Sequence, residues 1–333
     1  MHPRNNIPAD VQPEVEALQG IQKQIDALTN KHITKRKRWH PSTILAESMY
    51  FLGDKKKDQL ELIRLLRNQA KQMPDLIRVC LLVNKVTEDG IVQFPRALAN
   101  SFGENAALLR WLDVWSAEED FHGGVLDLYI FLSEALKPSA VEELGYLYKS
   151  GGFHPPWEGR PFWTIFYTIL QEKATQVSHQ GIGKLVSNHE PVLAAILNYI
   201  KADEGAHHHV YREFFKLLLS IDPNRALMAA LQAIRKMHMP GKSMPGYDTY
   251  IDAFEELKIY TIGSLATIVE EVSKYLNIGN LCNLSGEGGQ AQEQIMDKPK
   301  ALRRTWQLYK HSRTRKSFSP EFLYGREVII EPH

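Results

Sequence analysis

The sequence predicts an all-α fold with a central bundle of unusually long helices. Apolar residues recur at spacings of three and four through most of the 333 residues, which is the period of helices that bury one face. Prolines stand at or near the starts of the periodic segments, where a missing N–H costs little. Strand patterns are almost absent, and the only candidate is VIIEPH at residues 328–333.

Each helical element follows from this period and from the residues at its ends. The periodic segments are, in order, 14–30, 56–72, 75–99, 105–135, 160–188, 190–220, 223–238 and 248–277. The prolines near their starts are Pro74, Pro138, Pro161, Pro191 and Pro223. Asp222 before Pro223 makes a cap-and-start pair. Glycine and proline gather at 150–161, 240–246 and 285–289, which we expect to connect packed helices.

The organisation of the chain indicates one domain over residues 1–333. No internal repeat, low-complexity tract or long linker divides it. Within this domain we expect an N-terminal arm at 1–34, a four-helix core within 75–220, and flanking helices with a C-terminal segment at 221–333.

Composition limits the function classes. The chain carries 40 Lys and Arg against 39 Asp and Glu, so no general attraction to nucleic acid or anionic membranes is expected. Its two cysteines, Cys80 and Cys282, are too few for a disulfide framework or a four-thiolate iron–sulfur cluster. Neither a signal peptide nor an apolar run of about 20 residues is present in the sequence. We therefore expect a soluble, cytoplasmic protein.

Two of the long segments place an acid and an imidazole within an apolar stripe. On 105–135 the pair is Glu119 and His122, and on 190–220 it is Glu204 and His207. The flanking stripe residues are Leu108, Leu112, Trp115, Leu126 and Tyr129 on the first segment, and Leu193, Leu197, Ile200, Tyr211, Phe214 and Leu218 on the second. A buried lone carboxylate is costly, so each pair indicates a bound cation.

Two further segments carry a glutamate on a comparable face. Glu88 lies with Ile77 and Leu81, and Glu172 lies with Ile165 and Ile169. About one Glu-x-x-His is expected by chance, and each acid considered singly is equally well explained as a solvated surface residue. Together they give a Glu from each of two helices and a Glu-x-x-His from each of two others, which is the ligand set of ferritin-like di-iron or di-manganese proteins.

The chemistry of this donor set fits two divalent metals. Four carboxylates supply the charge that neutralises two such ions, and mixed oxygen and nitrogen donors suit iron or manganese. Structural zinc would favour thiolates. Iron is the predicted metal because it can use oxygen.

The motifs resemble those of the soluble acyl-[acyl carrier protein] desaturases from about residue 35 to the C-terminus. The matching segments are KRWHP (37–41), TED (87–89), WSAEEDFHGG (115–124), ILQEKATQVSHQ (169–180), ADEGAHHHVY (202–211) and SGEGGQAQ (285–292). The resemblance implies that two iron ions are bound by the six residues Glu88, Glu119, His122, Glu172, Glu204 and His207. It also implies that Asp203 bonds to a ligand histidine, His122, that Trp115 and Trp39 form an electron path, and that Thr175 lies on the oxygen side. Plain core aromatics would explain both tryptophans equally well.

The resemblance implies an O2-dependent reaction that introduces a cis double bond into a saturated acyl chain on acyl carrier protein. The chain has no dinucleotide fingerprint, so the two electrons must come from an external donor, by resemblance a ferredoxin. A homodimer is also implied. Three basic clusters are candidates for meeting acidic partners, and a solvated surface explains each of them as well. They are Lys35 to Arg38, Lys55 to Lys57, and the group Arg303, Arg304, Arg313 and Arg315.

The chain departs from the family pattern at three places. Gly205 stands where a basic residue usually follows the second motif's Glu, and Pro95 lies later after Glu88 than expected. His208 and His209 lack the ligand spacing, so we expect them to point to other faces.

Two other functions fit the same ligands. A related di-iron oxygenase would act on another long-chain or carrier-bound substrate, and the radical-generating subunit of a ribonucleotide reductase would use the same donors. A ferritin-type iron-handling protein is disfavoured by the extra helices after residue 220.

Overall fold

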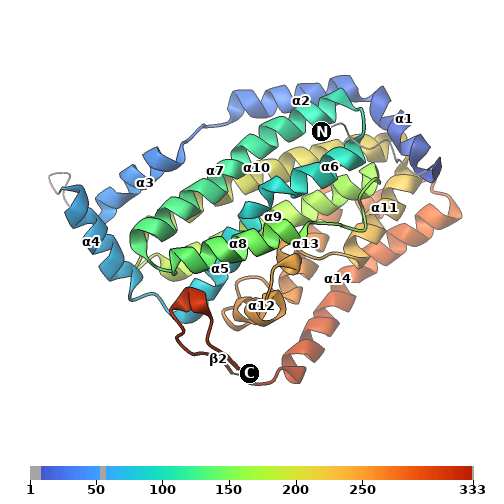
Figure 1. Ribbon diagram of the computed structural model, residues 1–333. Coiled ribbons are helices and arrows are strands. Elements are labelled where there is room, and N and C mark those ends of the chain that lie inside the picture. Colours follow the sequence, from blue (N-terminus) through green and yellow to red (C-terminus); the bar gives the residue numbers. More distant parts are fainter. Residues whose placement is uncertain (1–8, 53–57, 332–333) are drawn as a thin grey trace.

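The computed structural model describes residues 9–52 and 58–331, and it confirms the all-α prediction (Figure 1). The first half of the chain forms α1 (Gln12–Gly20), α2 (Gln22–Lys35), α3 (Pro41–Met49), α4 (Gln59–Ala70), α5 (Asp75–Glu88), α6 (Phe94–Phe102), α7 (Ala106–Ser133) and α8 (Pro138–Gly151). The second half forms α9 (Pro161–Val186), α10 (Pro191–Ile221), α11 (Pro223–Arg235), α12 (Tyr247–Glu256), α13 (Ile262–Tyr275) and α14 (Gly286–Ser312). Two short strands, β1 (Lys316–Phe318) and β2 (Val328–Ile330), pair antiparallel.

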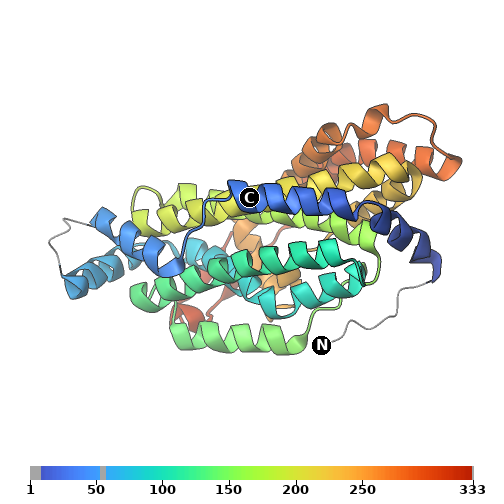
Figure 2. The same cartoon turned by 90° about the horizontal axis from the view of Figure 1, so that it is seen from above.

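The core of the molecule is the bundle of α5, α7, α9 and α10. Each of these helices contacts at least two of the others, and α9 packs along much of α10. Helix α2 lies across α7 and α10, as Figure 2 shows from above. Helices α11, α13 and α14 pack together, with α11 and α13 also against α9. Within the described residues, no helix combines the length and apolar character needed to cross a bilayer.

Polar residues at mid-height divide the bundle core into two hydrophobic clusters. On α7 one cluster contains Trp111 and Trp115, and the other begins at Val125. Between them stand the buried residues Glu118, Glu119 and His122. Buried polar residues also interrupt the apolar faces of α9 and α10 at this level. Several helices therefore contribute to one buried polar layer.

Three predicted helices are each broken in the structure. The segment 75–99 is wrong as one helix: α5 ends at Glu88, a 3-10 turn spans Asp89–Val92, and α6 follows. Gly90 lies in that turn, where a Cβ would stand only 3.0 Å from the Tyr148 hydroxyl oxygen. The segment 248–277 divides at Lys258, whose φ of 54° ends the helix, and the segment 14–30 divides at Ile21.

Three helices, α3, α8 and α14, were not predicted. Residues 285–289, expected to be a connection, instead begin α14, because the Ser285 hydroxyl accepts a hydrogen bond from the Gly288 N–H and caps the helix. Packing against α11 and α13 outweighs the low helix propensity of these glycines. The strand candidate is confirmed for Val328–Ile330, and Pro332 and His333 lie outside the described residues.

Candidate metal centre

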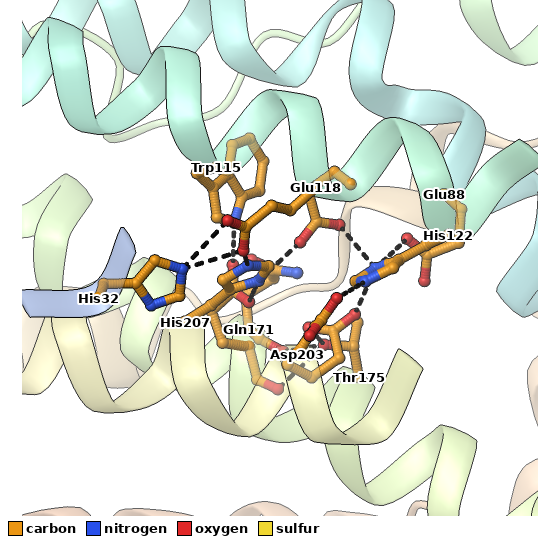
Figure 3. A network of polar contacts seen from close by, with 12 residues as sticks. His32, Glu88, Trp115, Glu118, His122, Gln171, Thr175, Asp203 and His207 are labelled. Carbon is orange, nitrogen blue, oxygen red and sulfur yellow. Dashed lines mark hydrogen bonds and ion pairs between the residues drawn. The ribbon is translucent and has the colours of Figure 1, made fainter. Parts of the chain in front are cut away.

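Four helices bring the six predicted ligands to one buried place, where Figure 3 labels Glu88, His122 and His207. Glu88 is the last residue of α5, Glu172 lies on α9, and the two Glu-x-x-His pairs come from α7 and α10. All six side chains are buried: Glu88, Glu119, His122, Glu172, Glu204 and His207.

The six residues form two groups that share two glutamates. Each group offers four donor atoms lying within 4.8 Å of one another. The first group is Glu88, Glu119, His122 and Glu204, and the second is Glu119, Glu172, Glu204 and His207. Glu119 and Glu204 are common to both. This arrangement offers adjacent sites for two metal ions bridged by carboxylates.

Both imidazoles turn the same nitrogen toward the carboxylates. His207 Nδ1 lies 2.9 Å from Glu119 Oε1 and 3.3 Å from Glu172 Oε2. His122 Nδ1 lies 3.4 Å from Glu119 Oε2 and 3.5 Å from Glu204 Oε1. In each histidine the Nδ1 atom is therefore the candidate metal donor, and Nε2 is left for a supporting residue.

Buried donor atoms at this place lack hydrogen-bond partners among the described residues. They are Glu119 Oε1, His122 Nδ1, Glu172 Oε2, Glu204 Oε1 and His207 Nδ1. Buried polar atoms are normally satisfied, and a concentration of unsatisfied carboxylate and imidazole atoms within one site is typical of a place that binds cations. The donor set fits two divalent metals in both charge and atom type.

The pKa values of the clustered carboxyl groups are shifted because the groups are buried close to one another. Burial, and then the negative charge of Glu204, raise the pKa of Glu172 and of Glu119. Burial alone would raise the pKa of Glu88, but the neighbouring imidazoles of His122 and His179 outweigh this and lower it. The group as a whole carries carboxylates that repel one another when no cation lies between them.

Each predicted ligand histidine lies beside an acid from the opposite helix. Asp203 on α10 lies 3.5 Å from His122 Nε2, and Glu118 on α7 lies 2.8 Å from His207 Nε2. Burial alone would raise the pKa of Glu118, but the bonds from His207 and His32 lower it to about 2. Such partners fix the tautomer and direction of a metal-binding imidazole.

Sequence reasoning did not identify Glu118, although a signal was available. Both motifs read acid-Glu-x-x-His, as Glu118-Glu119 and Asp203-Glu204. The family resemblance implies a role only for the second of these acids, Asp203. The repeated acid in the same position of both motifs indicates that both acids have the same function.

His179 is a second residue that was not predicted, although it lies within the quoted segment ILQEKATQVSHQ. Its Nε2 lies 2.8 Å from Glu88 Oε1, and its Nδ1 lies 3.2 Å from Asn84 Nδ2. Ser178 donates a hydrogen bond to Asn84 Oδ1. Because His179 stands one helical turn after Thr175, it reaches the same side of α9 as the ligand layer.

The two tryptophans lie at different halves of the centre. Trp39 stacks on His122 with ring centroids 6.1 Å apart, and its Nε1 donates to Asp203 at 2.8 Å. Trp115 Nε1 donates to Glu172 Oε1 at 3.0 Å. Ring contacts between His122 and His207 and between His207 and Trp115 join the two indoles through the centre. Their role as an electron path stays a prediction.

Thr175 and the histidine run have defined places. The Thr175 hydroxyl donates to Glu204 Oε2 at 2.7 Å. His208 is buried and donates from Nδ1 to the Ile169 carbonyl, while burial lowers its pKa to about 3. His209 is exposed. His208 and His209 thus point away from the six ligands.

Two small pockets lie on the Glu88 and Thr175 side of the centre, and both are lined by Thr87, Glu88 and Thr175. The first, which we call the outer lobe, is largely apolar, with Ala174, Met239, Tyr247, Ile251, Phe254 and Tyr260 in its wall. The second, which we call the inner lobe, is also lined by the buried residues Phe94, Trp115 and Gln171.

Metal binding is expected to release protons and to strengthen as the pH rises from about 6 to 8. Burial lowers the pKa of His122, but Glu119 and its other acidic partners outweigh this, and the pKa of both His122 and His207 stands well above 6.5. Both imidazoles are thus protonated near neutral pH without metal, and the metal must displace those protons. Protonation of the two imidazoles adds to the free energy of unfolding of the metal-free protein, and this contribution is complete below pH 6.5. It is lost as the pH rises through the raised pKa values of the two histidines in the folded protein.

Calorimetry of metal binding in buffers of different ionisation enthalpy measures this proton release. A binding enthalpy that is independent of the buffer, together with an affinity that is constant between about pH 6 and 8, would contradict the assignment of the imidazoles as displaced donors.

Comparison with known proteins agrees with this geometry. The fatty acid desaturase family model matches residues 13–323. A chloroplastic stearoyl-[acyl-carrier-protein] 9-desaturase from Olea europaea is 29% identical over 311 residues, covering 88% of this chain and 78% of that protein. Another, 9-desaturase 4 from Arabidopsis thaliana, is 29% identical over 314 residues, with coverage of 88% and 76%.

A solved structure shares the fold. It is the X-ray structure of DesA2 from Mycobacterium tuberculosis, a protein assigned as an acyl-ACP desaturase, with a TM-score of 0.60 and 16% identity. The match covers 83% of this chain and 99% of that one, and it confirms the prediction of a ferritin-like helical bundle. Since the family model spans nearly the whole sequence, the chain belongs to the fatty acid desaturase family.

Proposed function

We propose that this protein is an O2-dependent desaturase that forms a double bond in a saturated acyl chain carried on acyl carrier protein. The observation that carries the proposal is the pair of four-residue groups sharing Glu119 and Glu204, found in a member of the fatty acid desaturase family. Relatives named stearoyl-[acyl-carrier-protein] 9-desaturases support the substrate class.

Iron is the proposed metal, held by the six ligand residues defined above. Bound there, two iron ions supply the oxygen-dependent oxidising chemistry that unactivated C–H bonds require. The protein contributes a buried site from which bulk water is excluded. Thr175, through its hydrogen bond to Glu204, holds one shared carboxylate in place on the side that faces the inner lobe.

The outer lobe is the proposed entrance for the acyl chain. Met239, Tyr247 and Ile251 in its wall are half-buried and reach toward the surface, whereas Phe94 and Trp115 in the wall of the inner lobe are buried. An acyl chain entering this way passes Glu88 and ends against Phe94. The carbons beside the ligands are then the ones from which hydrogen is removed.

An acidic carrier protein and a ferredoxin are the proposed partners. The exposed lysines Lys31 and Lys35, which we call the α2 cluster, line a surface pocket beside α2 and α10. Lys55 to Lys57 lie outside the described residues. In the third basic group, Arg303, Arg313 and Arg315 pair with Glu270, Glu256 and Glu331. The α2 cluster is therefore the favoured docking place, and a homodimer remains part of the proposal.

Phe94→Ala is expected to shift the substrate preference toward longer acyl chains. Phe94 lines the inner lobe and contacts four aromatic rings, those of Trp115, Phe153, Trp157 and Tyr167. Its truncation opens space beside the inner lobe. One methylene is worth about 10-fold or more in kcat/KM, so the ratio for longer against shorter substrates should rise by at least that factor.

The matched control for this variant is Phe166→Ala. Phe166 is equally buried and packs on Phe215, but it lines neither lobe. Competition between acyl carrier substrates of different length, with products separated by mass spectrometry, measures the ratio. Equal ratios in Phe94→Ala and wild type would remove Phe94 from the wall of the acyl site.

The proposed activity is tested with iron-loaded protein, reduced ferredoxin, oxygen and stearoyl- or palmitoyl-loaded carrier protein. Mass spectrometry of the released acyl chain should show the loss of two hydrogens. A product heavier by one oxygen would identify a hydroxylase, the main alternative for the same ligands. Absence of any product from both substrates, with iron bound, would contradict desaturation of carrier-bound chains of this length.

A further inference from the structure

A short stretch at the end of α2 contacts both acids that hold the ligand histidines. His32 Nε2 lies 3.0 Å from Glu118 Oε2, and Trp39 Nε1 donates to Asp203 Oδ2 at 2.8 Å. Between them in sequence, Arg36 Nη1 lies 2.9 Å from Glu118 Oε1 and Arg36 Nη2 lies 3.6 Å from Asp203 Oδ2. One guanidinium therefore connects the supports of both halves of the centre.

The ion pairs of Arg36 lie in largely buried surroundings, which strengthens them. Its side chain is only 11% exposed, and those of Glu118 and Asp203 are 1% and 11% exposed. Ion pairs with so little solvent are weakly screened, and removal of one partner leaves an uncompensated buried charge. The neighbouring cations Lys35, Lys37 and Arg38 are exposed by contrast.

The charge balance of the site also favours a cation at the position of Arg36. Two divalent metals neutralise the four ligand carboxylates, but Glu118 and Asp203 add two further negative charges in the adjoining layer. Arg36 places a positive charge beside both of these acids. Its planar fork suits two carboxylates at once, which a lysine ammonium cannot match.

We propose that Arg36 is a positioning residue that fixes Glu118 and Asp203 together, and through them the Nδ1 atoms of His207 and His122. Loss of Arg36 then weakens metal binding at both positions, not at one. The inference rests on the proposed di-iron site, but not on the identity of the acyl substrate.

The test compares Arg36→Gln with Arg38→Gln, which removes the same charge from an exposed position two residues away. Anaerobic titration with Fe2+ against a chelator measures the affinity of both sites. Loss of supporting partners typically costs about 10- to 100-fold in metal affinity, and Arg36→Gln should lose that much at each position while Arg38→Gln stays within about 2-fold of wild type. The reduction potential of the centre should shift in Arg36→Gln alone.

Arg36→Lys provides the second variant, and it keeps the charge without the fork. Its affinity should fall between those of wild type and Arg36→Gln, with a difference between the two sites because an ammonium reaches only one acid. Wild-type affinity and potential in both Arg36 variants would overturn the inference. If the wild type binds two irons but does not desaturate the acyl chain, the proposed function is contradicted. The Fe2+ affinities of the Arg36 variants would still test the role of Arg36.

Discussion

Glu204→Gln is expected to lose both metal ions and to reduce desaturation by more than about 100-fold, the upper range for loss of a supporting residue. Glu204 belongs to both four-residue groups, so its loss removes a shared donor from each site. The amide is isosteric but carries no charge, and it makes a poor bridge between cations. Metal content by elemental analysis, alongside turnover of acyl carrier substrate, measures the effect.

The same variant should not be destabilised when metal is absent. The charge of Glu204 raises the pKa of Glu119 and Glu172, which shows that the three carboxylates repel one another within the buried site. Removing one charge relieves this repulsion, so the metal-free variant should unfold at or above the wild-type temperature. Added iron should stabilise the wild type only.

Two results would contradict the role of Glu204. Full iron content in Glu204→Gln would remove Glu204 from the ligand set. A metal-free variant that melts well below the metal-free wild type would mean that the side chain is mainly structural. Glu213→Gln, on the same helix but outside both groups, provides the control.

His122→Ala is expected to retain one metal ion and to lose turnover by more than about 100-fold. His122 belongs only to the group with Glu88, and the other group keeps all four donors. The retained ion cannot supply the paired chemistry that the proposed function needs. Iron stoichiometry per chain and far-ultraviolet circular dichroism distinguish the loss of one ion from a loss of fold.

Exposed His209 on α10 provides the matched control, because His209→Ala should bind two irons and turn over normally. A stoichiometry of two in His122→Ala would mean that the two groups are not the separate sites described. A stoichiometry of zero with intact helicity would mean that neither site binds without the other.

The six predicted ligands could be found from the sequence because several of them are charged residues on otherwise apolar helix faces. Glu119 and Glu204 occupy apolar stripes of long helices, where burial of an acid requires a partner. The helical period then places His122 and His207 on the same faces. All six predicted ligands come together in the structure, although their binding of metal remains a prediction.

The supporting residues were less predictable for a physical reason. Glu118 stands one residue before Glu119, about 100° away around the helix, where a surface acid would be unremarkable. It is buried because α2 packs across α7 and covers it with His32 and Arg36. The packing of one helix over the face of another depends on the tertiary structure. It cannot be predicted from the local pattern of a single sequence.

The helix boundaries near the centre were missed for the same kind of reason. Periodicity continues through Glu88 into α6, yet the chain turns at Asp89–Val92 to fit against Tyr148 of α8. Gly90 in that turn and Pro95 after it were visible in the sequence. Their effect depends on the neighbouring helix α8, which the periodic pattern did not indicate.

Anomalous X-ray scattering at the iron edge, from crystals of the iron-loaded protein, tests the central claim most directly. We predict two peaks, one in contact with Glu88 and His122 and the other with Glu172 and His207, with Glu119 and Glu204 between them. A single peak held by His32, Glu118 and His207, the third cluster of potential donors, would contradict the account.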